Sequence, residues 1–283
     1  MAFREIINQM IDHLGGPPPP GPVSEAMLDG FKQAIDLANE CRGDPRVLFR
    51  ALQAFAATGN EALFAAGVAY VQYHGAYIQG ITYDRDGMEV AGAWLMRAEA
   101  QDAGIVEFSV IRAFIEIHSR ELAGIAELLE DVRQRDSVNY YALTAELEYY
   151  AVLGKLDQMM ATFQRALPLA LSATRRAYLY HRIGRYNLYH NRPDASLDAY
   201  RELSRLTPDD PWMWHNMSII LFEKKRFEEA RQCNAAALEL MDFEAARWLY
   251  RELNRLRSRR VVRWLGVAAV LTIAVALAFA ALG

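Results

Sequence analysis

Apolar side chains recur at helical spacing along nearly the whole chain, and residues 23–244 show no alternation of the kind that a half-buried strand requires. Glycine, proline and acidic turn residues interrupt this pattern at intervals that suit helical hairpins. The pattern predicts twelve helices, near 24–41, 46–57, 61–78, 88–102, 105–118, 121–134, 138–153, 156–171, 174–190, 194–206, 211–223 and 227–240. The sequence therefore predicts an all-α protein in which successive helices run antiparallel.

The first 16 residues form a separate amphipathic segment. Its large apolar side chains recur with a helical period on one face: they are Phe3, Ile6, Ile7, Met10, Ile11 and Leu14. Gly15 and Gly16 can end this helix, and residues 17–22, PPPPGP, form an extended linker. Burial of so many apolar side chains is favourable. We therefore expect residues 1–16 to dock on a helical surface, either on the chain's own repeats or on another subunit.

The second half of the chain is periodic at 34 residues. Large, small and turn-forming residues fall at matching positions of 177–210 and 211–244, and more loosely of 140–173. The matching residues are Tyr180, Ile183, Gly184, Ser196, Tyr200 and Pro208; then Trp214, Met217, Ser218, Leu221, Phe227, Ala230 and Ala237; and, in the looser unit, Leu143, Tyr150, Gly154, Leu156, Phe163 and Ala166. This pattern resembles the tetratricopeptide repeat, in which large residues of one helix pack against small residues of its neighbour.

The resemblance implies a right-handed superhelix of antiparallel helix pairs, a tetratricopeptide-like α-solenoid. Residues 23–139 would be a degenerate repeat region, 140–244 the repeat units, and 245–263 a capping helix with a basic collar. In this family the first helix of each pair lines a concave groove that binds a protein or peptide partner. Its groove positions correspond here to Tyr178, His181, Arg182, Arg185, Tyr189, Trp212, His215, Asn216 and Phe222, with Tyr141, Thr144, Glu148 and Ile219 beside them. Since aromatic residues and arginine dominate binding hot spots, we expect these side chains to form an exposed surface with a basic middle.

Composition and motifs argue against catalysis. The two cysteines, Cys41 and Cys233, and the six histidines show no metal-ligand spacing, and no nucleophile has a base at a diagnostic spacing. We therefore expect no enzyme activity, no cofactor and no metal site. The formal net charge is −4, and because six arginines and one acid occupy 251–263, the remainder carries −9. An acidic body of this kind argues against a nucleic-acid partner.

The last residues are typical of a membrane anchor. Residues 264–283 carry no charge and, at about 1.5 Å per residue, would be long enough as a helix to cross a bilayer. The arginines of 251–263 would mark the cytoplasmic side and suit anionic headgroups. We therefore expect a single-pass, tail-anchored membrane protein with its N-terminal domain in the cytoplasm. A buried core helix is the alternative interpretation of the same segment.

Two functions are consistent with this organisation. The first is a membrane-tethered tetratricopeptide scaffold or adaptor that holds a protein or peptide in its groove at the cytoplasmic face of the membrane. The second is a self-associating structural subunit or membrane effector that acts through its transmembrane helix. The second rests on a stripe of small residues that would let helices approach closely in lipid and form a homo-oligomer: Ala268, Thr272, Ala276 and Ala280.

Overall fold

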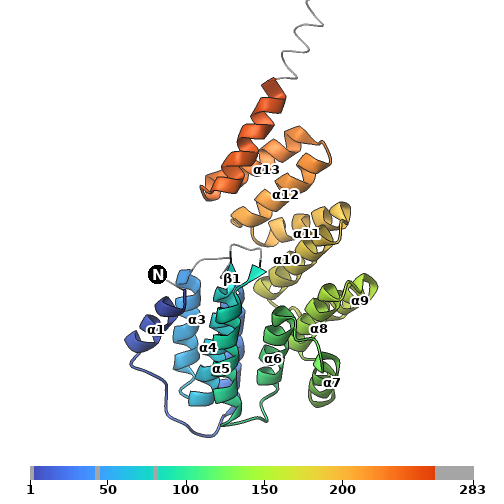
Figure 1. The fold of residues 1–283 in the computed structure, drawn as a ribbon. Helices are drawn as coiled ribbons and strands as arrows, with labels where there is room; N and C mark the ends of the chain where they lie inside the picture. Colours follow the sequence, from blue (N-terminus) through green and yellow to red (C-terminus); the bar gives the residue numbers. More distant parts are fainter. Residues whose placement is uncertain (1–2, 42–44, 79–81, 259–283) are drawn as a thin grey trace, which may run out of the picture. The chain divides into compact units, whose positions relative to one another are not determined.

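The computed structural model describes residues 3–41, 45–78 and 82–258, and most of these residues are helical (Figure 1). The chain divides into two compact units, Met1–His190 and Asn191–Gly283, called unit 1 and unit 2 below. The boundary lies inside the predicted repeat 177–210. Each unit is described by itself.

The helices lie within a few residues of the positions that the hydrophobic pattern predicts, which confirms the all-helical prediction for this part of the chain. Those of unit 1 are α1 (Phe3–His13), α2 (Glu25–Asn39), α3 (Pro45–Ala57), α4 (Glu61–Gly75), α5 (Arg85–Glu99), α6 (Val106–Ser119), α7 (Ile125–Arg135), α8 (Tyr140–Val152), α9 (Leu156–Ala166), followed by the short 3-10 helix η1 (Leu167–Leu169), and α10 (Ala173–Tyr189). Those of unit 2 are α11 (Pro193–Leu206), α12 (Pro211–Glu223), α13 (Phe227–Leu240) and a further helix over residues 244–258.

Short polar side chains begin many of these helices. The side chain of Ser24 accepts a hydrogen bond from the backbone N–H of Met27, and Asn60 caps α4 through the N–H of Leu63. Loss of such a cap costs about 1 kcal/mol. The same arrangement begins α5, α8, α10 and α12, at Asp84, Asn139, Ser172 and Asp210. The helix starts therefore follow from local sequence chemistry.

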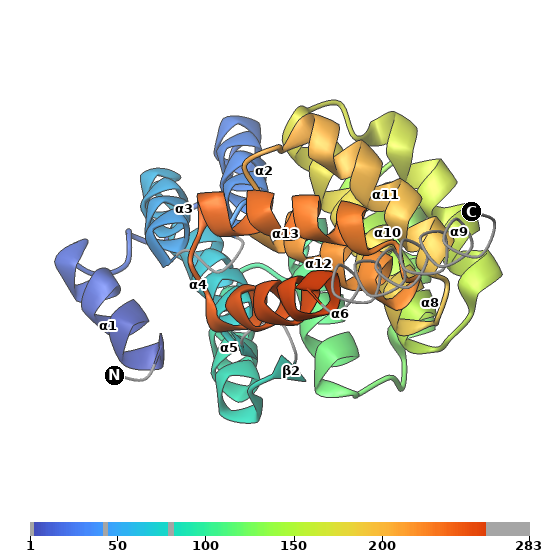
Figure 2. The same ribbon diagram turned by 90° about the horizontal axis from the view of Figure 1, so that it is seen from above.

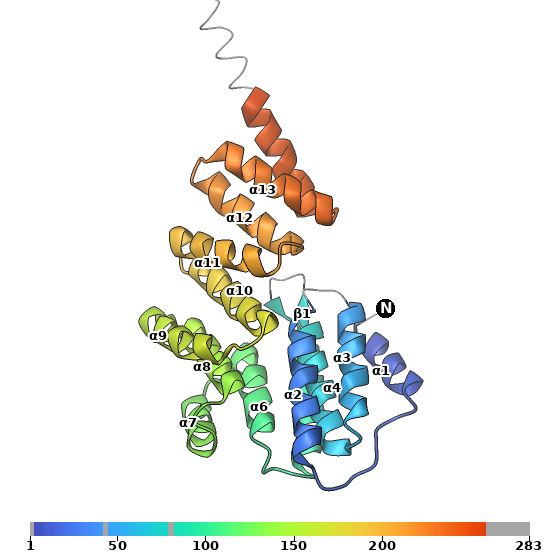
Figure 3. The ribbon, with the colours of Figure 1, turned by 180° about the vertical axis from the view of Figure 1, so that it is seen from behind.

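In unit 1, neighbouring helices form hairpins that pack on one another (Figures 1 and 3). Helix α2 pairs with α3, α4 with α5, α6 with α7, and α8 with α9. Helix α1 lies on the outer side of α3 and α4, away from α2 (Figures 2 and 3), and it buries Ile7 and Ile11 there. The linker that follows α1 is held by Asn60, whose Nδ2 donates to the carbonyl of Gly21 at 2.7 Å. The amphipathic segment therefore docks on the chain's own helices.

One short hairpin departs from the predicted helix 61–78. Helix α4 ends at Gly75, and strands β1 (Tyr77–Ile78) and β2 (Thr82–Tyr83) pair antiparallel, with Tyr77 opposite Tyr83. Aromatic and β-branched residues favour this extended conformation, and they follow a helix-ending glycine. The prediction of continuous helix to residue 78 was therefore wrong.

The predicted membrane-spanning helix is also corrected. In the part of the chain that the structure describes, no helix is long and apolar enough to cross a bilayer. The last described helix, 244–258, carries Arg247, Arg251 and Arg255, whose charges make it unsuited to lipid. Residues 264–283 lie outside the described residues, and so do the small residues of the proposed oligomerisation face: Ala268, Thr272, Ala276 and Ala280. The transmembrane helix, the tail-anchored localisation and the bilayer as a partner are withdrawn from the account.

Candidate functional site

The groove residues predicted on α8 and α10 do come together in unit 1, but they meet in its interior. The Glu148 side chain is fully buried, and its Oε1 lies 3.0 Å from Nε of Arg182. The hydroxyl of Tyr178 donates to the same oxygen at 3.1 Å and accepts a hydrogen bond from Arg182 Nη2 at 3.0 Å. His118 Nε2, from α6, donates to Oε2 of Glu148. Each oxygen of this buried carboxylate is therefore paired.

The charges in this cluster fix its protonation. Although burial opposes it, the positive charge of Arg182 holds the pKa of Glu148 well below its usual range. Burial lowers the pKa of His118 despite the neighbouring carboxylate. Burial and the charge of Arg182 lower the pKa of His74, at the end of α4, to about 3. Near neutral pH the cluster therefore holds an ion pair and neutral imidazoles.

These pKa shifts predict loss of stability in acid. Below pH 6.5 the unfolded chain binds a proton at His74 that the folded chain does not bind until the pH reaches about 3. Since the unfolded state binds more protons in this range, the free energy of unfolding falls by about 1.4 kcal/mol for each unit by which the pH is lowered. His74→Phe keeps a ring against Tyr70 and Tyr73. Denaturant titrations at several pH values give the free energy of unfolding as a function of pH. Between about pH 6 and 4 the variant should show a smaller slope, which corresponds to about one proton fewer taken up on unfolding. An unchanged slope would contradict the assignment.

Helix α2 contacts α6, α8 and α10 through polar side chains, and α4 packs on α6. The carboxylate of Asp36 on α2 pairs with Arg175 on α10 at 3.0 Å, and the Tyr141 hydroxyl of α8 lies 2.9 Å from the same carboxylate. Lys32 of α2 pairs with Glu107 of α6 at 3.1 Å. Farther along, rings of α4 stack against α6 and β2: they belong to Tyr70, Tyr73, Phe114, Tyr83 and His118. The side chains predicted to face a partner thus face the chain itself.

The expectation of an exposed basic middle is therefore wrong for the arginines of α10. Arg182 and Arg185 are only 6% and 8% exposed, and Tyr178 is buried as well. His181 is half-buried, whereas Tyr189 at the end of α10 is 59% exposed. Beside them Tyr141, Thr144 and Glu148 are buried. A partner-binding role for these residues stays a prediction, and of those named here on α10 Tyr189 offers the most accessible side chain.

In unit 2 the predicted groove residues of α12 also contact their own unit. The ring of Trp212 lies 4.5 Å from that of Phe243, and His215 meets the same phenylalanine edge-on at 5.1 Å. Asn216 Nδ2 donates to the Tyr200 hydroxyl of α11 at 3.1 Å. Phe222 packs on Phe227, and Ile219 is half-buried. His215 is buried, and Trp212, Asn216 and Phe222 keep part of their surface open.

The 244–258 helix presents an accessible surface that the sequence analysis did not identify as a protein-binding site. Trp248 is 55% exposed and Tyr250 is 40% exposed, and exposed arginines lie on the same helix. We call this set the basic–aromatic surface; it consists of Arg247, Trp248, Tyr250, Arg251 and Arg255. A shallow surface pocket is lined by Glu244, Arg247, Tyr250 and Arg251. Trp, Tyr and Arg are the residue types that dominate binding hot spots, so their clustering in this helix is the sequence signal that could have identified the surface.

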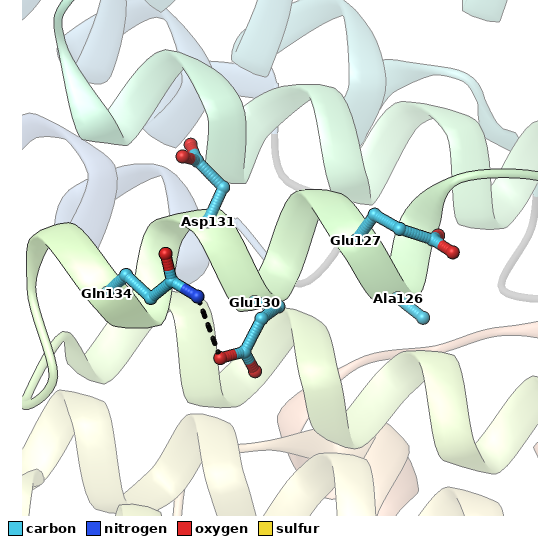
Figure 4. A pocket seen from close by; sticks show the side chains of 5 residues that line it. All are labelled: Ala126, Glu127, Glu130, Asp131 and Gln134. Carbon is cyan, nitrogen blue, oxygen red and sulfur yellow. Dashed lines mark hydrogen bonds between the residues drawn. The ribbon is translucent and has the colours of Figure 1, made fainter.

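A second surface pocket lies on α7 and is acidic (Figure 4). Glu130 accepts a hydrogen bond from Gln134 and also pairs with Arg133, and Asp131 pairs with Arg135 at 2.8 Å. Such neighbouring pairs along an exposed helix are ordinary solvated contacts. Among the residues that the structure describes, no group of three or more His, Cys, Asp or Glu side chains is placed to hold a metal. The absence of enzyme activity, cofactor and metal stays a prediction.

Comparison with known proteins supports the fold. No family model and no curated protein matches the chain. Among solved structures, the chain is similar to PilF of Pseudomonas aeruginosa, with a TM-score of 0.53 and 17% identity, over 69% of this chain and 86% of that chain. At this identity the likeness concerns the fold alone. It supports a tetratricopeptide-like arrangement of the helix pairs, as the 34-residue pattern predicts.

Proposed function

We propose that this protein is a helical-repeat scaffold that binds a partner protein through the basic–aromatic surface of its 244–258 helix. Stacked helix pairs bury their apolar faces against one another and leave extended surfaces for partners, which is the common use of repeat folds. The observation that carries the proposal is the exposure of Trp248 and Tyr250 beside arginines. Tryptophan, tyrosine and arginine are the residue types in which binding hot spots are enriched.

This proposal moves the partner site from the predicted groove. In unit 1 most groove positions of α8 and α10 are buried, and the hydroxyl of one of them, Tyr141, donates to Asp36 of α2 at 2.9 Å. Helix α2 buries Phe31, Ala34 and Ile35 in the core, so its removal would expose much apolar surface. Binding to the exposed face of the 244–258 helix therefore costs less free energy, because no helix has to be displaced.

Site-directed photo-crosslinking in the native host tests the proposal. Trp248→benzoylphenylalanine, in the full chain, should form a covalent adduct of discrete mass with one partner, because this side chain would be at the centre of the interface. The matched control is Leu171→benzoylphenylalanine, since Leu171 is 80% exposed in unit 1. It should give no adduct of that mass. The same bands at both positions, or none at position 248, would contradict the proposal.

A further inference from the structure

The arginines of the basic–aromatic surface form one stripe. Arg247, Arg251 and Arg255 are four residues apart, so they lie on the same helix face with a rise of about 6 Å between neighbours. The opposite face is marked by side chains that are almost completely buried: Ala246, Leu249 and Leu253. The arginine stripe therefore points away from the body of unit 2.

Two aromatic side chains border this stripe. Trp248 precedes Arg251 by three residues, and Tyr250 follows Arg247 by three, so the helical period places the two rings on opposite sides of the arginines. Both rings are substantially exposed. The surface thus offers a central row of positive charge between two apolar edges.

The internal ion pairs of this stripe are weak. Arg247 lies 3.4 Å from Asp242, and Arg255 lies 3.6 Å from Glu252, with both arginine side chains more than half exposed. Exposed pairs of this kind contribute little to stability. Carboxylates of a partner can therefore replace Asp242 and Glu252 at small cost, and they would gain three arginines in a row.

We infer that the basic–aromatic surface binds an acidic amphipathic helix of a partner protein, with a carboxylate on every fourth residue and apolar side chains on both sides of that row. This inference rests on the proposed function and names its partner class. Helical repeat spacing matches the arginine spacing, since both follow the same rise per residue. The aromatic rings would cover the flanking apolar side chains, which a hydrophilic polyanion does not provide.

The test uses the full chain and a fluorescent, alanine-based helical peptide with glutamate at every fourth residue and leucine beside each glutamate. The peptide should bind, and its affinity should fall as salt is raised, because exposed charges are screened. Arg251→Glu with Arg255→Glu should weaken binding at least about tenfold. The matched control is Arg201→Glu with Arg205→Glu, which makes the same charge change on exposed positions of α11. That control should stay within about twofold, as a rim charge away from the site would.

Two further arms identify what the surface recognises. Trp248→Ala leaves the net charge unchanged and should weaken binding several-fold, on the order of fivefold, if the aromatic border contributes. A peptide with glutamine in place of each glutamate should not bind. Equal loss in both charge-reversed pairs, binding of the glutamine peptide, or displacement of the peptide by vesicles rich in anionic lipid would overturn the inference. If the peptide fails while position 248 still crosslinks a partner, the scaffold proposal stands and the acidic helix falls.

Discussion

Arg182→Met should lower the free energy of unfolding of unit 1 by about 3–5 kcal/mol, because it leaves a buried carboxylate without its countercharge. The affected carboxylate is that of Glu148, which is fully buried and lies 3.0 Å from Arg182 Nε. The Tyr178 hydroxyl that also contacts it carries no charge, and burial opposes protonation of His118, so neither fully replaces Arg182. Denaturant unfolding, followed by circular dichroism and by limited proteolysis of unit 1, measures the change.

Two companion variants make this result specific. Arg205→Met removes an arginine whose pair with Glu202 is largely exposed, so it should change stability by less than about 0.5 kcal/mol. Glu148→Leu with Arg182→Met removes both charges and should recover much of the loss, since apolar groups often replace a buried ion pair well. A single Arg182 variant as stable as the Arg205 variant would show that the buried pair is not needed.

Gly67→Ala should destabilise the packing of α3 on α4 by about 3 kcal/mol, at the upper end of typical overpacking costs. A Cβ at Gly67 would lie 2.2 Å from Cγ of Phe55. The Phe55 ring is completely buried and also packs on Phe31, so it cannot move aside freely. Thermal unfolding of the purified variant measures the loss as a lower melting temperature.

The control for this substitution is Gly92→Ala in α5. Apart from the adjacent residues and the backbone of its own helix, no atom lies within 4 Å of a Cβ at Gly92, so alanine there gains helix propensity without a clash. It should stabilise the protein by about 0.5–1 kcal/mol. If Gly67→Ala and Gly92→Ala shift the melting temperature in the same direction, the close approach of Phe55 to Gly67 is not a constraint on the fold.

The helices could be predicted because their signals are local. A cap such as Ser24 or Asn60 acts on a backbone group three residues away, and the apolar period needs only one helix to be visible. The 34-residue repeat adds the pairing of neighbouring helices, which the similarity to PilF supports at the level of fold. The helical part of the fold therefore follows from short-range pattern.

The burial of the predicted groove residues could not be foreseen, because the helix that packs on them is distant in the sequence. The repeat pattern gives the face on which Arg182 lies, but it does not show that α2 returns to that face. The contact of Asp36 with Arg175 joins residues 139 apart in the sequence, and no local pattern indicates it. The β1–β2 hairpin was missed for the same reason, because its Tyr83 stacks on His118, which is distant in the sequence.

The basic–aromatic surface was missed for a different reason. The arginines of 251–263 were assigned to a membrane collar because an uncharged segment follows them. Within the described chain no helix can cross a membrane, and the exposed Trp248 and Tyr250 give the same arginines another context. Charge alone suited both interpretations, and only the burial pattern of 244–258 distinguished the exposed face from the packed one.

The most direct measurement is photo-crosslinking from position 248 in two backgrounds, with position 189 as the alternative site. The account predicts a discrete partner adduct with Trp248→benzoylphenylalanine, its loss when Arg251→Glu and Arg255→Glu are added, and none with Tyr189→benzoylphenylalanine. Tyr189 is the relevant comparison because it is the exposed groove residue of α10. An adduct from position 189 together with none from position 248 would contradict the account and return the partner to the groove.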